Sequence, residues 1–206
     1  MRGFWENWRL GILNLLAVAI LTVIAFHPGL DRVLDSGKWS LRFLLLCLAM
    51  TPLNTLFGWR SAVKLRKPLG LWAFAFGVLH FAFYVLAWGS FDFLKPPVAS
   101  YIFLGIGTLS ILSALAVTSN RWAMKRLGKN WKRLHRLVYL AGGVAVVHAL
   151  LATTMGKKVL IRDPNAQQEL AVYLFVLVIL LALRIPVIRS AAGSLKRLRI
   201  ARLKQA

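Results

Sequence analysis

The chain has 206 residues, of which 59% are hydrophobic and only 16% are charged. An ordinary soluble domain carries about 45 to 50% apolar and about 25% charged residues, so this composition excludes one. The charge is strongly basic, with 27 lysines and arginines against 6 aspartates and glutamates, a formal net charge of +21. In a polar sequence such a charge would indicate a nucleic-acid partner, but among long apolar runs it indicates a membrane protein.

Six apolar stretches are each long enough, at about 20 residues, to cross the hydrocarbon core of a bilayer as a helix. In chain order they lie at roughly residues 10–26, 40–57, 69–88, 99–118, 134–155 and 170–189. Turn-forming residues separate them, including Gly58 and Pro68 between the second and the third. Pro52 and Pro186 fall inside the second and the sixth, where membrane helices tolerate a kink. We therefore predict an all-α protein, a six-helix transmembrane bundle in a single domain over residues 1–206.

The first stretch follows Arg2 and Arg9 and has to be compared with a secretory signal peptide. Its apolar run is long, and its end at residues 25–28 (Ala-Phe-His-Pro) lacks the small-x-small pattern of a cleavage site. We therefore interpret it as the first membrane helix.

The positive charges alternate along the chain in a way that predicts the orientation. The N-terminus, the second and fourth loops and the C-terminal region together hold 20 of the 27 basic residues and one acidic residue, Glu6. Membrane proteins keep lysine and arginine on the cytoplasmic side, so we predict both termini in the cytoplasm, with about +19 of the net charge inside and about +2 outside. The charge is then a topology signal and an attraction for anionic lipid.

Two histidines lie within predicted membrane helices, where an ionisable side chain is costly and marks a functional hypothesis. His80 is 8 residues before the outer end of the third stretch and His148 is 7 before the outer end of the fifth. At about 1.5 Å per residue, both imidazoles lie roughly 10 to 12 Å below the outer surface. Residues on the same helix face as each histidine are small, and aromatic residues lie nearby. These are Ala73 and Gly77, Ala141 and Ala145, and the aromatic residues Phe76, Phe83 and Tyr84.

This pattern suits a flat macrocycle ligated by both imidazoles, but two other interpretations stay open. Small residues let membrane helices pack closely, and the histidines could hydrogen-bond across such a contact. They could also belong to a metal site or a proton path, although a transition metal would want carboxylate or thiolate ligands that neither helix supplies. The residues alone favour a bis-histidine haem and packing histidines equally.

The other two histidines lie at the ends of predicted helices. His135 precedes His148 on the fifth stretch, at a distance of about 20 Å along the helix axis and about 140° around it. Its basic neighbours at residues 132–136 favour an interfacial basic residue near the cytoplasm. His27, next to Pro28 and Gly29, is interpreted as an interfacial turn residue.

Several other cofactor motifs are weak or missing. Cys47 is the only cysteine, which excludes a disulfide framework and a C-x-x-C-H site for covalent haem attachment. Residues 104–107 (Leu-Gly-Ile-Gly) are a fragment of a dinucleotide fingerprint inside the fourth stretch, and we interpret them as helix packing. The residues after the last stretch are too few for a flavin and NADPH domain, so we expect electrons to come from another molecule.

Three segments of the sequence resemble the MsrQ family of ferric-reductase-like transmembrane proteins. They are residues 67–72 (Lys-Pro-Leu-Gly-Leu-Trp) leading to His80 and Tyr84, residues 126–140 leading to His148, and residues 51–53 (Thr-Pro-Leu). The segment that carries His135 and leads to His148 is the specific one. The likeness covers nearly the whole chain.

The resemblance implies a b-type haem protein of the bacterial inner membrane, the membrane subunit of a protein-methionine-sulfoxide reductase system. Such a subunit would take electrons from the quinone pool or a flavin reductase. It would pass them outward to MsrP, a periplasmic molybdopterin enzyme that repairs methionine sulfoxide in oxidised proteins, so the catalytic site is expected on the partner. FMN is implied as a second cofactor. His80, His135 and His148 match the family's haem-associated histidines, with His80 and His148 on the haem iron.

One departure from the wider ferric-reductase pattern concerns the cytoplasmic half of the bundle. Those proteins carry two histidines on the third helix as well, which gives two stacked bis-histidine haems. Here the inner position, roughly four helical turns before His80, falls at Arg66 and Lys67. We therefore expect an outer haem between His80 and His148, whereas His135 has no histidine opposite. Arg66 is a candidate contact for a second haem, although a surface anchor or a contact to a propionate or phosphate is favoured.

Three functions follow from these observations. The first is an electron-transfer subunit, the second a haem-containing ferric or other metal-ion reductase, and the third a non-redox membrane module whose histidines only pack. Two filled axial positions would suit one-electron transfer and disfavour oxygen activation at the iron.

Overall fold

The structure, a computed structural model, describes residues 2–88, 98–155 and 165–185. Every regular element within these ranges is an α-helix, which confirms the predicted all-α class for the described part of the chain. The helices are α1 (Arg2–Phe26), α2 (Arg32–Phe57), α3 (Ala62–Trp88), α4 (Val98–Val117), α5 (Arg121–Leu127), α6 (Lys129–His135), α7 (Leu137–Met155) and α9 (Ala166–Ala182).

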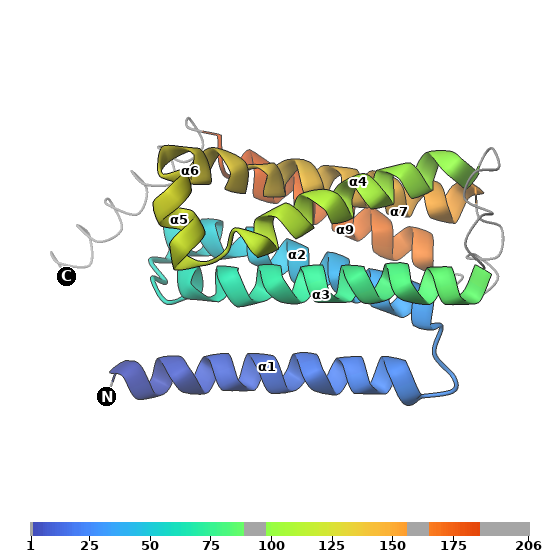
Figure 1. The fold of residues 1–206 in the computed structure, drawn as a ribbon, viewed down its shortest axis with the longest axis horizontal. Helices are drawn as coiled ribbons and strands as arrows, with labels where there is room; N and C mark the ends of the chain where they lie inside the picture. Colours follow the sequence, from blue (N-terminus) through green and yellow to red (C-terminus); the bar gives the residue numbers. More distant parts are fainter. Residues whose placement is uncertain (1, 89–97, 156–164, 186–206) are drawn as a thin grey trace, which may run out of the picture.

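Two pairs of helices form the centre of the bundle. α2 packs along α3, α4 packs along α7, and α9 covers α7 and α2 (Figure 1). α1 lies to one side and touches α2 and α3. α5 and α6 cap the end of the bundle at which α1, α3 and α7 begin and α2 and α9 end. We call this the inner end and the opposite one the outer end, following the orientation predicted from the charges.

The described helices define a multi-pass membrane protein. Four helical segments are long and apolar enough to cross a membrane. A fifth span is present if two helices joined by a bend of 97° count as one span. The four are Trp8–Phe26, Arg32–Phe57, Ala62–Ala87 and Lys129–Thr154, and the bent pair is Tyr101–Val117 with Arg121–Leu127. α9 is apolar but has only 17 residues. The sixth span and the orientation of the bundle therefore stay predictions.

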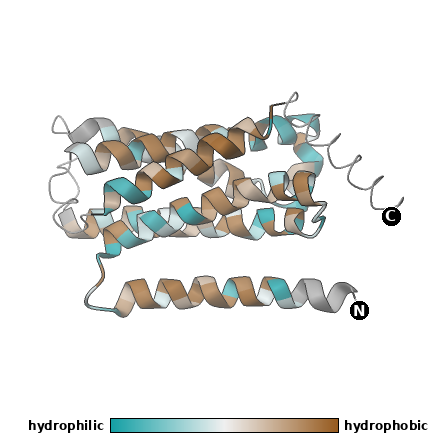
Figure 2. Cartoon of the chain, turned by 180° about the vertical axis from the view of Figure 1, so that it is seen from behind, coloured by the Kyte–Doolittle hydropathy of each residue, from teal (hydrophilic) through white to brown (hydrophobic). Residues whose placement is uncertain are grey.

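The surface of the bundle is apolar along its length. Leu15 on α1 is 72% exposed, as expected for a side chain that faces lipid. Figure 2 shows apolar residues dominating the middle of the helices, with hydrophilic residues gathered around α5 and α6. The inner end is therefore the more polar end of the described chain.

α2 begins eight residues earlier than the sequence predicted, at Arg32 instead of near residue 40. Asp31 caps it, because its Oδ1 accepts hydrogen bonds from the backbone N–H groups of Val33 and Leu34, both at 3.0 Å. The first two turns are too polar to look like part of a membrane span, but they continue the helix.

The predicted break at Pro68 is wrong, because α3 starts at Ala62 and continues through this proline. Gly58 does end α2. Its φ of 71° lies in the left-handed region that glycine adopts without strain, and its N–H bonds to the carbonyl of Asn54. The last four residues of the predicted sixth span, which include Pro186, lie outside the described residues.

The predicted fifth span is interrupted near its start. α6 ends at His135 and α7 begins at Leu137, with Arg136 between them donating its N–H to the carbonyl of Arg133 at 3.2 Å. His135 and His148 therefore do not lie on one uninterrupted helix, and the ideal-wheel estimate of their relative direction does not apply.

Candidate functional site

The structure brings His80 of α3 and His148 of α7 together in the outer half of the bundle. Their ring centres are 6.1 Å apart and their ring planes are inclined by 77°. Both side chains are half-buried. Two helices that are distant in the sequence thus present one imidazole each to the same place.

Each imidazole is fixed by a backbone carbonyl on a neighbouring helix. His80 Nδ1 lies 2.7 Å from the carbonyl oxygen of Val33 on α2, and His148 Nδ1 lies 2.6 Å from that of Tyr101 on α4. A carbonyl can only accept a hydrogen bond, so both Nδ1 atoms carry the proton and donate it. In a neutral imidazole this leaves a lone pair on each Nε2, the tautomer that metal-ligating histidines use.

A glycine lies against each imidazole, one helical turn after the carbonyl that holds it. A Cβ atom added at Gly37 would lie 2.9 Å from Nδ1 of His80, and one added at Gly105 would lie 2.8 Å from Cε1 of His148. These separations are shorter than ordinary van der Waals contacts of about 3.5 Å. Glycine is therefore required at both positions for the rings to lie where they do.

The two arrangements are copies of each other along the chain. The glycine follows the carbonyl residue at the same interval in both, and it precedes the histidine at the same interval in both. The same difference in residue number therefore separates Val33 from Tyr101, Gly37 from Gly105, and His80 from His148. This equal spacing is a signal in the sequence, but it does not identify either glycine without the structure. The interpretation of residues 104–107 as helix packing agrees with the position of Gly105.

The geometry of the pair fits two imidazoles on one metal. A histidine–metal bond is about 2.0 to 2.1 Å long, and each ring nitrogen lies about 1.1 Å from its ring centre, so two imidazoles on opposite sides of one metal would have centres about 6.2 to 6.4 Å apart. The observed separation is 6.1 Å. Within the described residues, no group of three or more His, Cys, Asp or Glu side chains could hold a metal ion alone. The pair therefore fits a group that brings further iron ligands of its own, as haem does.

The small residues next to the histidines serve helix packing. Ala73 is fully buried, and its carbonyl accepts a hydrogen bond from Ser40 Oγ of α2 at 2.8 Å. A Cβ atom at Gly77 would meet Ser40 Oγ at 3.3 Å and Leu109 Cδ1 of α4 at 3.5 Å. On this face of α3 the small residues let α2 and α4 approach closely, as in other membrane bundles.

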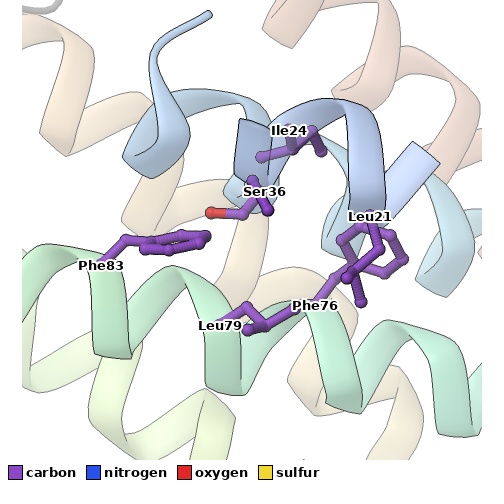
Figure 3. Close-up of a pocket in the computed structure, with 7 residues that line it drawn as sticks. Leu21, Ile24, Ser36, Phe76, Leu79 and Phe83 are labelled. Carbon is purple, nitrogen blue, oxygen red and sulfur yellow. The ribbon is translucent and has the colours of Figure 1, made fainter. Parts of the chain in front are cut away.

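Phe76 and Phe83 line a small cavity between α1, α2 and α3. Leu21 of α1 and Ser36 of α2 line its other sides (Figure 3). Its volume of about 30 Å³ is room for a water molecule and far below the several hundred Å³ of a cofactor pocket. Phe76 also stacks on Phe43, with ring centroids 5.4 Å apart. These aromatic side chains therefore pack α1 and α2 onto α3.

His135 lies at the inner end and is not part of the His80–His148 pair. Its ring stacks on Trp131 at 4.0 Å, and its Nε2 lies 3.2 Å from Thr118 Oγ1 at the end of α4. The indole N–H of Trp131 also bonds to the Thr118 carbonyl, at 2.9 Å. His135 thus joins α6 to the α4–α5 bend. His27 lies in the turn after α1, where its Nδ1 accepts the N–H of Gly29.

Arg66 lies at the inner end as well, in the second turn of α3. Its carbonyl accepts a hydrogen bond from Cys47 Sγ of α2 at 3.2 Å, whereas the Nε of its side chain is buried without a partner in the part of the chain that the structure describes. Cys47 is a free, buried thiol.

Comparison with known proteins gives the class of this bundle. Residues 36–156, more than half of the chain and both histidines of the pair, match the family described as "Ferric reductase like transmembrane component". The chain therefore belongs to the ferric reductase-like transmembrane family.

A curated relative is more specific. The chain is 39% identical over 186 residues to the "Protein-methionine-sulfoxide reductase heme-binding subunit MsrQ" of Agrobacterium fabrum, which covers 87% of this chain and 79% of the relative. The resemblance to MsrQ that the sequence motifs indicated is confirmed, and the chain is a homologue of that protein. No solved structure matches the chain.

Proposed function

We propose that this chain is a haem b membrane subunit that carries electrons across the bacterial inner membrane for the repair of methionine sulfoxide. The observation that carries the proposal is the His80–His148 pair, with ring centres 6.1 Å apart and each Nδ1 held by a backbone carbonyl. Haem bound there would supply one-electron transfer. The relative's name, which includes both haem binding and methionine sulfoxide reductase, supports the same assignment.

The chain's own residues would prepare the site before haem arrives. His80 and His148 would hold the haem iron. The carbonyls of Val33 and Tyr101 fix the tautomer and the ring orientation, and hydrogen bonds of this kind also raise the basicity of the ligand nitrogen. The pair lies in the outer half of the bundle, which supports delivery of electrons to a periplasmic partner of the MsrP type if both termini are cytoplasmic.

The electron donor would act from the inner end. The quinone pool or a flavin reductase is the donor that the resemblance implies, with FMN as a second cofactor. The basic residues around α5 and α6 support binding of an anionic flavin there, because lysine and arginine attract phosphate.

A reduced-minus-oxidised spectrum of the purified full-length protein tests the haem assignment. We expect a b-type spectrum that is lost or strongly reduced in His80→Ala and in His148→Ala. His27→Ala is the matched control, because it removes an imidazole from an exposed turn and should leave the spectrum unchanged. His135→Ala should retain the spectrum of the outer pair. A wild-type protein without a b-type band, or unchanged spectra in both pair variants, would refute the assignment.

A direct metal-ion reductase is the second candidate, since the family description names ferric reductases. The two functions differ in the electron acceptor. Protein in lipid vesicles with a reduced quinone should transfer electrons to an MsrP-type molybdopterin subunit and only slowly to a ferric chelate. The opposite preference would favour the metal-ion reductase.

A further inference from the structure

Three buried polar atoms near the inner end have no hydrogen-bond partner among the described residues. They are Thr51 Oγ1 on α2, Arg66 Nε on α3 and Arg184 Nε just beyond α9. Burying a polar group without a hydrogen bond costs about 1 to 3 kcal/mol, and for a charged group the cost is higher. Three such atoms from three separate parts of the chain indicate that a partner for them is missing.

The three residues lie around one turn of α2. Cys47 Sγ donates to the carbonyl of Arg66, and Arg184 Nη2 donates to the carbonyl of the next residue, Leu48, at 2.6 Å. Thr51 follows Cys47 and Leu48 by 4 and 3 positions, so it lies on the same face of α2. Arg66 and Arg184 are close enough for their positive charges to repel each other.

The guanidinium of Arg184 is also held in a fixed orientation. Its Nη1 donates to the hydroxyl of Tyr139 on α7, and its central carbon lies 4.4 Å from the centre of the Tyr139 ring. Nη1 and Nη2 each have a protein partner, whereas Nε has none among the described residues. A fixed cation of this kind is pre-organised for binding.

No carboxylate in the described structure neutralises the two arginines. The acidic side chains that it describes, Asp31, Asp35 and Glu169, lie at or near the starts of α2 and α9, toward the outer end. Along the sequence, Glu6 near the start of α1 is the one acidic residue predicted on the inner side, and no aspartate or glutamate occurs at residues 36–91 or after Glu169. Two partly buried like charges without a counter-ion are unfavourable unless an anion joins them.

We propose that Arg66, Arg184 and Thr51 form a binding site for the phosphate group of a ligand that enters from the inner end. A phosphate monoester carries a charge of about −1.5 to −2, which matches two guanidinium groups. Its oxygens can accept the unpaired N–H groups and the threonine hydroxyl. The phosphate could be the monoester of a soluble cofactor such as FMN, or the phosphodiester of an anionic phospholipid, which carries a smaller negative charge. For FMN the site rests on the flavin of the proposed function, but it does not depend on the haem assignment, because it lies at the other end of the bundle.

Titrations with a phosphorylated ligand and its unphosphorylated counterpart test the site. The full-length haem-loaded protein in phosphatidylcholine nanodiscs would be titrated with FMN and with riboflavin. We expect FMN to bind at least tenfold more tightly than riboflavin and inorganic phosphate to compete with FMN. Arg66→Gln and Arg184→Gln should each weaken FMN binding at least tenfold, Thr51→Val less, and riboflavin binding should not change. Arg32→Gln makes the same charge change at an exposed position at the outer end, where α2 begins, and should have no effect.

Nanodiscs with and without phosphatidylglycerol distinguish a lipid from a soluble ligand. If the phosphate is a lipid headgroup, phosphatidylglycerol should raise the unfolding temperature of the wild type but not of Arg66→Gln, and FMN should bind no better than riboflavin. The proposal is overturned if Arg66→Gln equals the wild type in both experiments. Arg184 also holds α2 and α7 together, so a loss of the haem spectrum in Arg184→Gln would indicate misfolding. In that case the phosphate site is tested with Arg66→Gln and Thr51→Val alone.

Discussion

Gly105→Ala is expected to displace the imidazole of His148. The new Cβ would lie 2.8 Å from Cε1, 3.1 Å from Nδ1 and 3.3 Å from Nε2 of the ring. The shortest of these contacts is about 0.7 Å below an ordinary separation of about 3.5 Å. The ring cannot move freely, because Nδ1 is bound to the Tyr101 carbonyl at 2.6 Å. Either this hydrogen bond lengthens or the α4–α7 contact opens.

The expected cost can be bounded. Overpacking of this kind typically costs about 1 to 3 kcal/mol, which corresponds to roughly 5- to 150-fold weaker retention of haem at the pair. The intrinsic helix preference acts in the opposite direction, since alanine is favoured over glycine by about 1 kcal/mol within a helix. A loss in Gly105→Ala would therefore come from the contact with His148 and not from the helix itself.

The assay is haem content per chain after purification, together with the electron paramagnetic resonance spectrum of the ferric form, which responds to the orientation of axial imidazoles. Gly107→Ala is the matched control, because Gly107 lies on the same helix and a Cβ there would meet nothing within 4 Å. Gly37→Ala should behave like Gly105→Ala, since its Cβ would lie 2.9 Å from Nδ1 of His80. Equal haem content and equal spectra for the Gly105 and Gly107 variants would refute the reasoning.

Two further predictions concern the packing of α2. Glu169→Gln removes the carboxylate that pairs with Lys38 at 2.9 Å and with Arg42 at 3.4 Å. We expect it to destabilise the protein by about 1 to 3 kcal/mol, because the Lys38 side chain is only 15% exposed; a lower unfolding temperature in detergent would show this, whereas exposed Gln168→Ala should not change it. Cys47 is 6% exposed and donates to a backbone carbonyl of α3, so a maleimide should label it at least about tenfold more slowly in the folded protein than in denaturant. Equal labelling rates would show that this part of α2 opens readily.

The helical class and most of the apolar segments could be predicted from the sequence because the bilayer imposes a simple rule. A run of about 20 apolar residues has few alternatives to a helix. The rule fails at helix ends, where local chemistry decides. Asp31 caps α2, so that the helix begins among polar residues, and Pro68 is accommodated within the first turns of α3. Neither effect changes the mean hydropathy of the span enough to be seen.

The histidine pair was visible in the sequence because depth in a membrane can be counted along the chain. His80 and His148 lie at similar distances from the ends of their spans. Their partners were not visible, because the register between α2 and α3 and between α4 and α7 depends on side-chain packing. That register decides which carbonyl meets each Nδ1 and where Gly37 and Gly105 must lie. Arg184 was missed because it was counted as one more basic residue of the C-terminal region.

The constant offset between the α2–α3 pair and the α4–α7 pair also explains why the outer and inner ends of the bundle carry different residues. At the outer level, each pair supplies one carbonyl, one glycine and one histidine, and the offset between His80 and His148 relates all three. The same offset makes Lys67 the counterpart of His135 at the inner level, next to Arg66. A lysine or arginine is a cation and cannot complete a pair of neutral imidazoles, but it can bind an anion. The two helix pairs therefore supply the same three groups at equivalent positions where we propose haem. They have different residues at equivalent positions where we propose phosphate.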